Sequence, residues 1–248
     1  GDRTFFFENG ATAVEFFFVV SGYFFARSIE KINSNENRNI LRDTFNFMKS
    51  KIKTILPAHI ISNLMMIIFS MIIDIKSCWK TILNGLPGIF LVQMAAVWTD
   101  SMELSLNVPE WYISTMLLSM LIMLPISLLI RRKISGFFVN LILILIIIVI
   151  ISITGLCTKF NLPRTLICDA RGWAEICLGM LSYHLSIVIS KKDDLSNFCS
   201  MILKIIEIFA YNVPIVLGFL PINENYMPLV MSITAVFTCF ALSITFAK

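Results

Sequence analysis

Long blocks of uninterrupted apolar residues constrain this chain more than any other feature of its sequence. The longest block runs from Phe137 to Ile153, where Asn140 is the one polar residue before Ser152. An α-helix needs roughly 20 such residues to cross a bilayer. Inside hydrocarbon, backbone groups must be paired within their own segment or within a closed barrel, and barrel strands alternate apolar with polar residues. These blocks do not alternate, so the sequence predicts an all-α fold, a polytopic transmembrane helix bundle.

The composition excludes a soluble globular domain. Apolar residues make up 57% of the 248 positions, charged residues make up only 15%, and Phe alone occupies 21 positions. A soluble domain of this length needs polar residues on the outer face of every element. No cleavable signal peptide is visible, and no linker divides the chain. We expect one membrane domain over residues 1–248, with the lipid bilayer as its surroundings and no nucleic acid among its partners.

The cysteine pattern does not indicate a metal site. Six cysteines are scattered through the chain without a CxxC pair and without histidines interleaved at ligand spacing. Each lies in or beside an apolar stretch, which is typical of packing residues. We therefore expect no bound metal and no resident cofactor.

The basic residues predict the orientation of the chain in the membrane. The segment from Glu30 to Lys53, expected as a loop, holds the largest excess of Lys and Arg over acidic residues. The positive-inside rule makes it cytoplasmic and places Ser101 to Glu110 on the opposite side. Eight apolar segments are predicted as helices, near residues 11–29, 54–73, 82–98, 110–130, 137–157, 170–190, 199–221 and 226–246.

One of these segments does not fit a simple alternation. If residues 82–98 crossed the bilayer, the basic run from Arg131 to Lys133 would lie outside and the acidic loop before Trp111 would lie inside. The run Asn84-Gly-Leu-Pro-Gly88 is a helix breaker. A re-entrant or surface segment at 82–98 places both Arg131–Lys133 and Lys191–Lys192 in the cytoplasm.

An acidic residue lies inside the first apolar segment. Glu15 is surrounded by apolar residues, where a carboxyl group is costly unless it is paired, protonated or facing a wet cavity. Gly22 follows seven residues later on the same helical face, and its missing side chain would let a backbone or a ligand approach closely. The alternative is an interfacial Glu15 with Ser21 and Gly22 as ordinary helix-packing residues.

Three lysines precede the second apolar segment. Lys49, Lys51 and Lys53 lead into Thr54-Ile-Leu-Pro57 and place flexible ammonium groups at the mouth of a helix. Phosphates bind to such groups readily. From spacing alone, a topology signal is the simpler interpretation of these lysines.

Two later segments carry polar or amphipathic residues. Trp111 and Tyr112 could be belt residues at the headgroup level, and the hydroxyl of Ser114 could bond its own backbone. Arg171 and Glu175 are four residues apart, which allows either an intrahelical pair or an Arg presented to a polar cavity.

The chain has two histidines, His59 and His184. Each lies in an apolar helix with no acidic residue beside it in the sequence. Packed, hydrogen-bonded residues are the more usual interpretation of such histidines than catalytic bases.

Taken together, four motifs resemble the acyltransferase 3 family of membrane-bound O-acyltransferases. They are Glu15-Phe-Phe-Phe-Val-Val-Ser-Gly-Tyr23, the basic run ending in Lys51-Ile-Lys-Thr-Ile-Leu-Pro57, Trp111-Tyr-Ile-Ser114, and Arg171 to Gly179. The first motif is fairly specific, and the order and spacing of the four also match. The resemblance extends from about Phe5 to about Ser190.

This resemblance implies transfer of an acyl group, usually acetyl, from a cytoplasmic coenzyme A thioester to a hydroxyl of a surface carbohydrate, cell-wall polymer or lipid-linked glycan. It implies a multi-pass protein of the plasma membrane, here a bacterial inner membrane. Glu15 and Ser21 would be catalytic, and Lys49, Lys51 and Lys53 would bind the phosphates of acetyl-coenzyme A or another acyl-coenzyme A. The acceptor cavity would include Gly22, Tyr23, Trp111, Tyr112, Ser114, Arg171 and Glu175.

Two departures from the family pattern leave alternatives open. Thr54 stands near a position where the family has a basic residue. Family members also begin with a helix that carries an arginine and a histidine, the expected base, and this sequence is expected to lack that helix. A polytopic transporter or flippase would explain charged residues inside the membrane without chemistry, and a non-catalytic membrane partner would need no base. The sequence leaves the oligomeric state open.

Overall fold

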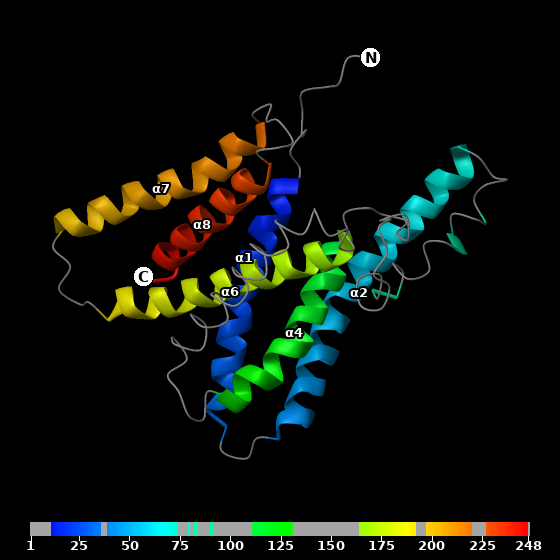
Figure 1. The fold of residues 1–248 in the computed structure, drawn as a ribbon, viewed down its shortest axis with the longest axis horizontal. Helices are drawn as coiled ribbons and strands as arrows, with labels where there is room; N and C mark the ends of the chain where they lie inside the picture. Colours follow the sequence, from blue (N-terminus) through cyan, green and yellow to red (C-terminus); the bar gives the residue numbers. More distant parts are fainter. Residues whose placement is uncertain are drawn as a thin grey trace. The chain divides into compact units, whose positions relative to one another are not determined.

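Six α-helices make up the part of the chain that the structure describes (Figure 1). The computed structural model describes residues 11–35, 39–73, 79, 82–83, 90–91, 111–130, 164–191, 197–219 and 227–247. Its helices are α1 (Ala11–Asn33), α2 (Ile40–Ile73), α4 (Trp111–Ile130), α6 (Arg164–Ser190), α7 (Asn197–Phe219) and α8 (Met227–Thr245). Strands are absent from these described ranges, so the all-helical prediction is confirmed for them.

Several of these helices have the length and composition of membrane spans. Four are long and apolar enough to cross a bilayer, at Ile40–Ile72, Trp111–Ile130, Asp169–Ser190 and Cys199–Leu217, and Val230–Thr245 is a shorter apolar helix. Helices α4, α7 and α8 begin and end within a few residues of the predicted segments. The predicted segment at 137–157 and nearly all of 82–98 lie outside the described residues.

The prediction of a loop from Glu30 to Lys53 is wrong at both ends, because α1 continues to Asn33 and α2 begins at Ile40. The side chain of Asn39 accepts a hydrogen bond from the Arg42 N–H at 3.2 Å, and the Asp43 carboxylate accepts one from the Asn39 N–H at 3.0 Å. These reciprocal bonds satisfy N–H groups that a helix start leaves unpaired. Neither Gly nor Pro occurs between this cap and Pro57, which lies inside the helix. The charged stretch therefore continues into the apolar one as a single helix.

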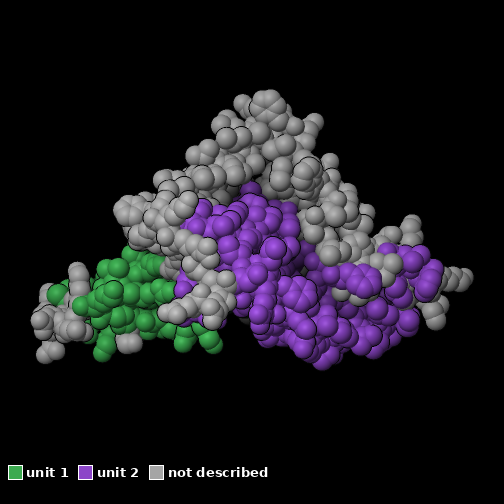
Figure 2. All heavy atoms as spheres, turned by 90° about the horizontal axis from the view of Figure 1, so that it is seen from below, with its two compact units in different colours: residues 1–31, 134–145, 174–248 green, residues 32–133, 146–173 purple. Residues whose placement is uncertain are grey.

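The chain divides into two compact units (Figure 2). Unit 1 consists of residues 1–31, 134–145 and 174–248, and unit 2 consists of residues 32–133 and 146–173. Almost all of α1, the second part of α6, α7 and α8 belong to unit 1. Helices α2 and α4 and the first part of α6 belong to unit 2.

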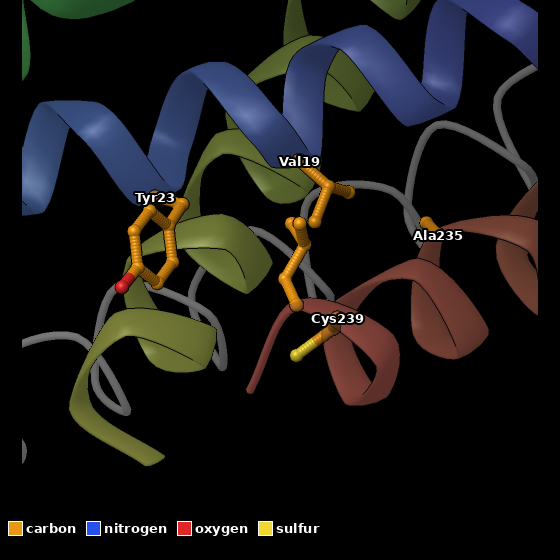
Figure 3. Packing of buried hydrophobic residues seen from close by; sticks show 5 residues of the cluster. Val19, Tyr23, Ala235 and Cys239 are labelled. Carbon is orange, nitrogen blue, oxygen red and sulfur yellow. The ribbon is translucent and has the colours of Figure 1, made fainter. Parts of the chain in front are cut away.

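Unit 1 has its core where α1 faces α8 (Figure 3). Five buried side chains form this cluster: Val19, Tyr23, Ala235, Cys239 and Leu242. Helix α7 lies along α8 (Figure 1) and exposes large apolar side chains such as Ile208 and Phe209. In a membrane protein such side chains face lipid rather than water, since lipid tails are as apolar as the residues themselves.

Unit 2 is built around α4, which packs against α2. The buried residues of α4 are Met and Leu together with the hydroxyl-bearing Ser114, Thr115, Ser119 and Ser127. Helix α2 instead exposes most of its apolar block, including Leu64 and Phe69. The hydroxyl groups of α4 therefore lie among its buried residues rather than on its exposed face.

Candidate active site

The acidic residue of the first motif is fully buried. Glu15 has 0% of its surface exposed, in the first part of α1. Ser21 is half-buried on the same helix. A carboxyl group at this depth costs several kcal/mol unless protein groups stabilise it, so it is retained for a functional or structural reason. The catalytic assignment of Glu15 and Ser21 stays a prediction.

Gly22 lies where two helix backbones meet within unit 1. A Cβ added at Gly22 would fall on the backbone carbonyl of Ile176, with its carbon at 2.8 Å. A Cβ added at Gly179 would fall on the carbonyl of Val19 and lie 2.8 Å from the Gly22 Cα. The close approach that the sequence suggested at Gly22 is therefore made by the backbone of α6. Two glycines, one on each helix, allow it.

Tyr23 is held from three sides. Its ring stacks on Phe246 with centroids 4.5 Å apart and meets the Tyr183 ring edge-on at 5.3 Å. Its hydroxyl lies 3.4 Å from the Ser186 hydroxyl, and the Tyr183 hydroxyl donates a hydrogen bond to the carboxylate of Glu30. These contacts join α1, α6 and the turn that follows α8, and they fix the orientation of the motif helix. Tyr23 is thereby placed as a packing residue, and its predicted contact with an acceptor remains untested.

Arg171 and Glu175, the two charged residues that the sequence singled out on α6, belong to different units. Glu175 belongs to unit 1 and is buried, with 4% of its surface exposed. Arg171 belongs to unit 2, where its guanidinium lies 5.4 Å from the centroid of the Trp111 ring. This cation–π contact places a permanent charge beside the first turn of α4. Trp111 and Tyr112 are half-buried and Ser114 is buried.

Unit 2 contains a buried carboxylate that the sequence prediction missed. Asp169 on α6, with 6% of its surface exposed, accepts a hydrogen bond of 2.7 Å from the hydroxyl of the fully buried Thr115 on α4. The predicted segment began at residue 170, one residue too late to include it. An acid followed by Ala-Arg inside an apolar run was the available signal.

The three lysines do not share one face, because the segment that carries them is helical. Lys49 and Lys53 are one turn apart and exposed, and Arg42 lies two turns before Lys49 on the same stripe. Lys51 points away from this stripe and is half-buried, with its ammonium group 5.6 Å from the centroid of the Phe47 ring. Only Lys49 and Lys53 are thus placed to meet one phosphorylated ligand together.

Both histidines have side-chain neighbours in the structure. His59 is buried, with ring nitrogens 3.3 and 3.4 Å from the side-chain nitrogen of Asn63. The His184 ring lies against Tyr183, with centroids 5.7 Å apart. Among the described residues, no group of three or more His, Cys, Asp or Glu side chains is arranged to hold a metal ion.

One comparison with known proteins gives a match over almost the whole chain. The model of an acyltransferase domain, acyltransferase 3, matches residues 2–248. No curated protein and no solved structure gives a significant match.

Proposed function

The chain belongs to the acyltransferase 3 family, and from this premise we propose that it O-acylates a carbohydrate. Family membership makes it an acyltransferase, and its apolar helices make it an integral membrane protein. The proposed reaction moves an acyl group, acetyl in the first instance, from a coenzyme A thioester to a hydroxyl of a surface or cell-wall glycan. The proposed location is the bacterial inner membrane.

The placement of Lys49 and Lys53 is the observation that supports a coenzyme A thioester as the acyl donor. With 34 residues and a rise of about 1.5 Å per residue, α2 is roughly 50 Å long, whereas the hydrocarbon core is about 30 Å thick. The apolar part from Thr54 to Ile73 is about 30 Å long and fills that thickness, so the basic part before Thr54 extends toward the headgroups or water. Two exposed ammonium groups on one face there can bind phosphates of a soluble donor.

The reaction moves one proton and one acyl group. The acceptor oxygen attacks the thioester carbonyl, the carbon–sulfur bond breaks, and the proton lost by the hydroxyl ends on the coenzyme A thiol. A positioned base accelerates this step by about a hundredfold to ten-thousandfold. Glu15 is proposed to accept this proton or to orient the group that does, because it is a fully buried carboxyl group on the helix of the most specific motif. Ser21 is proposed to assist on the same helix.

The donor site can be tested by comparing lysines on the two sides of α2. Lys49→Ala combined with Lys53→Ala is expected to raise the apparent KM for acetyl-coenzyme A by about tenfold, since two exposed charge-assisted contacts together contribute about 1.5 kcal/mol. The single variant Lys51→Ala is the matched control and should change this KM little. Equal donor KM values for wild type and the double variant, at equal amounts of folded protein, would reduce these lysines to topology signals.

A further inference from the structure

The N-terminal halves of α4 and α6 bring polar groups together inside unit 2. The Thr115 hydroxyl on α4 donates to Asp169 on α6 over 2.7 Å. One turn before Thr115, the Trp111 ring lies against the Arg171 guanidinium. The predicted outside position of Ser101 to Glu110 starts α4 outside, and Lys191 at the end of α6 predicts that α6 also runs from outside to inside. The N-terminal halves of both helices then lie toward the side of the membrane opposite the donor.

The hydrogen bond between α4 and α6 does not require a carboxylate as its acceptor. A hydroxyl group would accept the bond from Thr115 at a lower desolvation cost than a buried Asp169 carboxylate. One hydroxyl donates a single hydrogen bond, whereas a carboxylate has about four acceptor positions on two oxygens. Asp169 can therefore accept a hydrogen bond from a ligand hydroxyl while it keeps its bond to Thr115.

Trp173 adds a donor one turn along the same face of α6. Its indole Nε1 is buried and has no hydrogen-bond partner among the residues that the structure describes. Trp173 is four positions after Asp169, so the two side chains lie on the same face of the helix. A buried N–H without a partner is unfavourable, and a bound acceptor group would remove that cost.

We propose that Asp169 and Trp173 recognise the acyl acceptor as a carbohydrate; this rests on the proposed O-acylation. The carboxylate of Asp169 accepts a hydrogen bond from one sugar hydroxyl, and the Trp173 N–H donates to the oxygen of another. Thr115 positions the carboxylate, and Arg171 holds the Trp111 ring beside the site. A pair of one acceptor and one donor selects a ligand with several hydroxyls over an alcohol with one.

Binding of small probes tests this pair without requiring turnover. The wild-type protein in nanodiscs is titrated with methyl β-glucoside and with cyclohexanol, and binding is followed by saturation-transfer NMR. We expect saturable binding of the glucoside and weaker binding of cyclohexanol. Asp169→Asn should weaken glucoside binding by about tenfold and Trp173→Phe by about fivefold, on the scale of hydrogen bonds to charged and neutral groups. Trp79→Phe, at an exposed tryptophan, is the control and should bind like wild type.

Two further readouts separate a binding role from a structural one. Thermal unfolding shows whether Asp169→Asn and Trp173→Phe are folded, and Thr115→Ser should retain more glucoside affinity than Thr115→Val. No saturable glucoside binding by wild type, equal affinity for cyclohexanol, or full affinity in a folded Trp173→Phe protein would overturn the proposal. Release of coenzyme A thiol from acetyl-coenzyme A is measured separately. Its absence in wild type would contradict the proposed function, whatever the binding result.

Discussion

Replacing Gly22 with Ala should destabilise the protein although Ala is the better helix former. The added Cβ would lie 2.8 Å from the carbonyl carbon of Ile176, whereas ordinary contacts begin at 3.4 Å. Helices α1 and α6 must therefore part by roughly 0.6 Å or more, and a gap of that size forfeits about a quarter to a half of each dispersion contact. With on the order of 50 atom pairs at about 0.15 kcal/mol each, the loss is about 2–4 kcal/mol. The gain from removing a helical glycine is only about 0.5–1 kcal/mol.

The net expectation is a loss of about 1–3 kcal/mol, which is also the usual range for overpacked sites. Reversible unfolding in mixed micelles, followed by circular dichroism, measures it. Ala13→Val adds bulk at an exposed position of the same helix and should be close to neutral. Gly179→Ala should resemble Gly22→Ala, and the double variant should lose less than the sum, because the helices part only once. A Gly22→Ala protein as stable as wild type would refute the backbone contact.

The remaining predictions concern the orientation of the chain in the membrane and the hydrogen bond between α1 and α6. A cysteine introduced as Asn37→Cys should react with an impermeant thiol reagent from the cytoplasmic side alone, because the basic excess around it holds this segment inside; labelling from outside intact cells would invert the proposed donor side. Tyr183→Phe removes the hydrogen bond to Glu30 and should lower the free energy of unfolding by about 1 kcal/mol, the scale of interhelical bonds in membranes. Phe209→Tyr, on the exposed face of α7, is the control. If both variants lose the same free energy of unfolding, the hydrogen bond of Tyr183 does not stabilise the protein specifically.

The apolar pattern was sufficient to predict most of the described helices, and charge misled the prediction in one place. Helices α4 and α8 follow from blocks of apolar residues of the length that a bilayer requires. Residues 40–53 carry several charges and were predicted as a loop, but charge opposes burial rather than helix formation. The local pattern at Asn39 and Asp43, which caps the helix, was the better guide.

The candidate site was predictable where one helix carries the signal and not where two helices meet. The depth of Glu15 and the need for a small residue at Gly22 can be inferred from α1 alone. The partner of that glycine, Gly179, lies far away in the sequence, and no local pattern links the two. The Thr115–Asp169 bond is likewise a tertiary contact. Such pairs need the fold, because nothing in either segment specifies its neighbour.

Transfer of label to carbohydrate tests the central claim most directly. Membranes from cells that express the protein are incubated with radiolabelled acetyl-coenzyme A, and the envelope carbohydrate is then isolated and treated with mild alkali. We predict alkali-labile label on the carbohydrate with wild type, and roughly a hundredfold less, or lower still, with Glu15→Gln, because this carboxyl group is proposed to take part in proton transfer. Carbohydrate without label, in membranes that contain the folded protein and intact donor, would contradict the account.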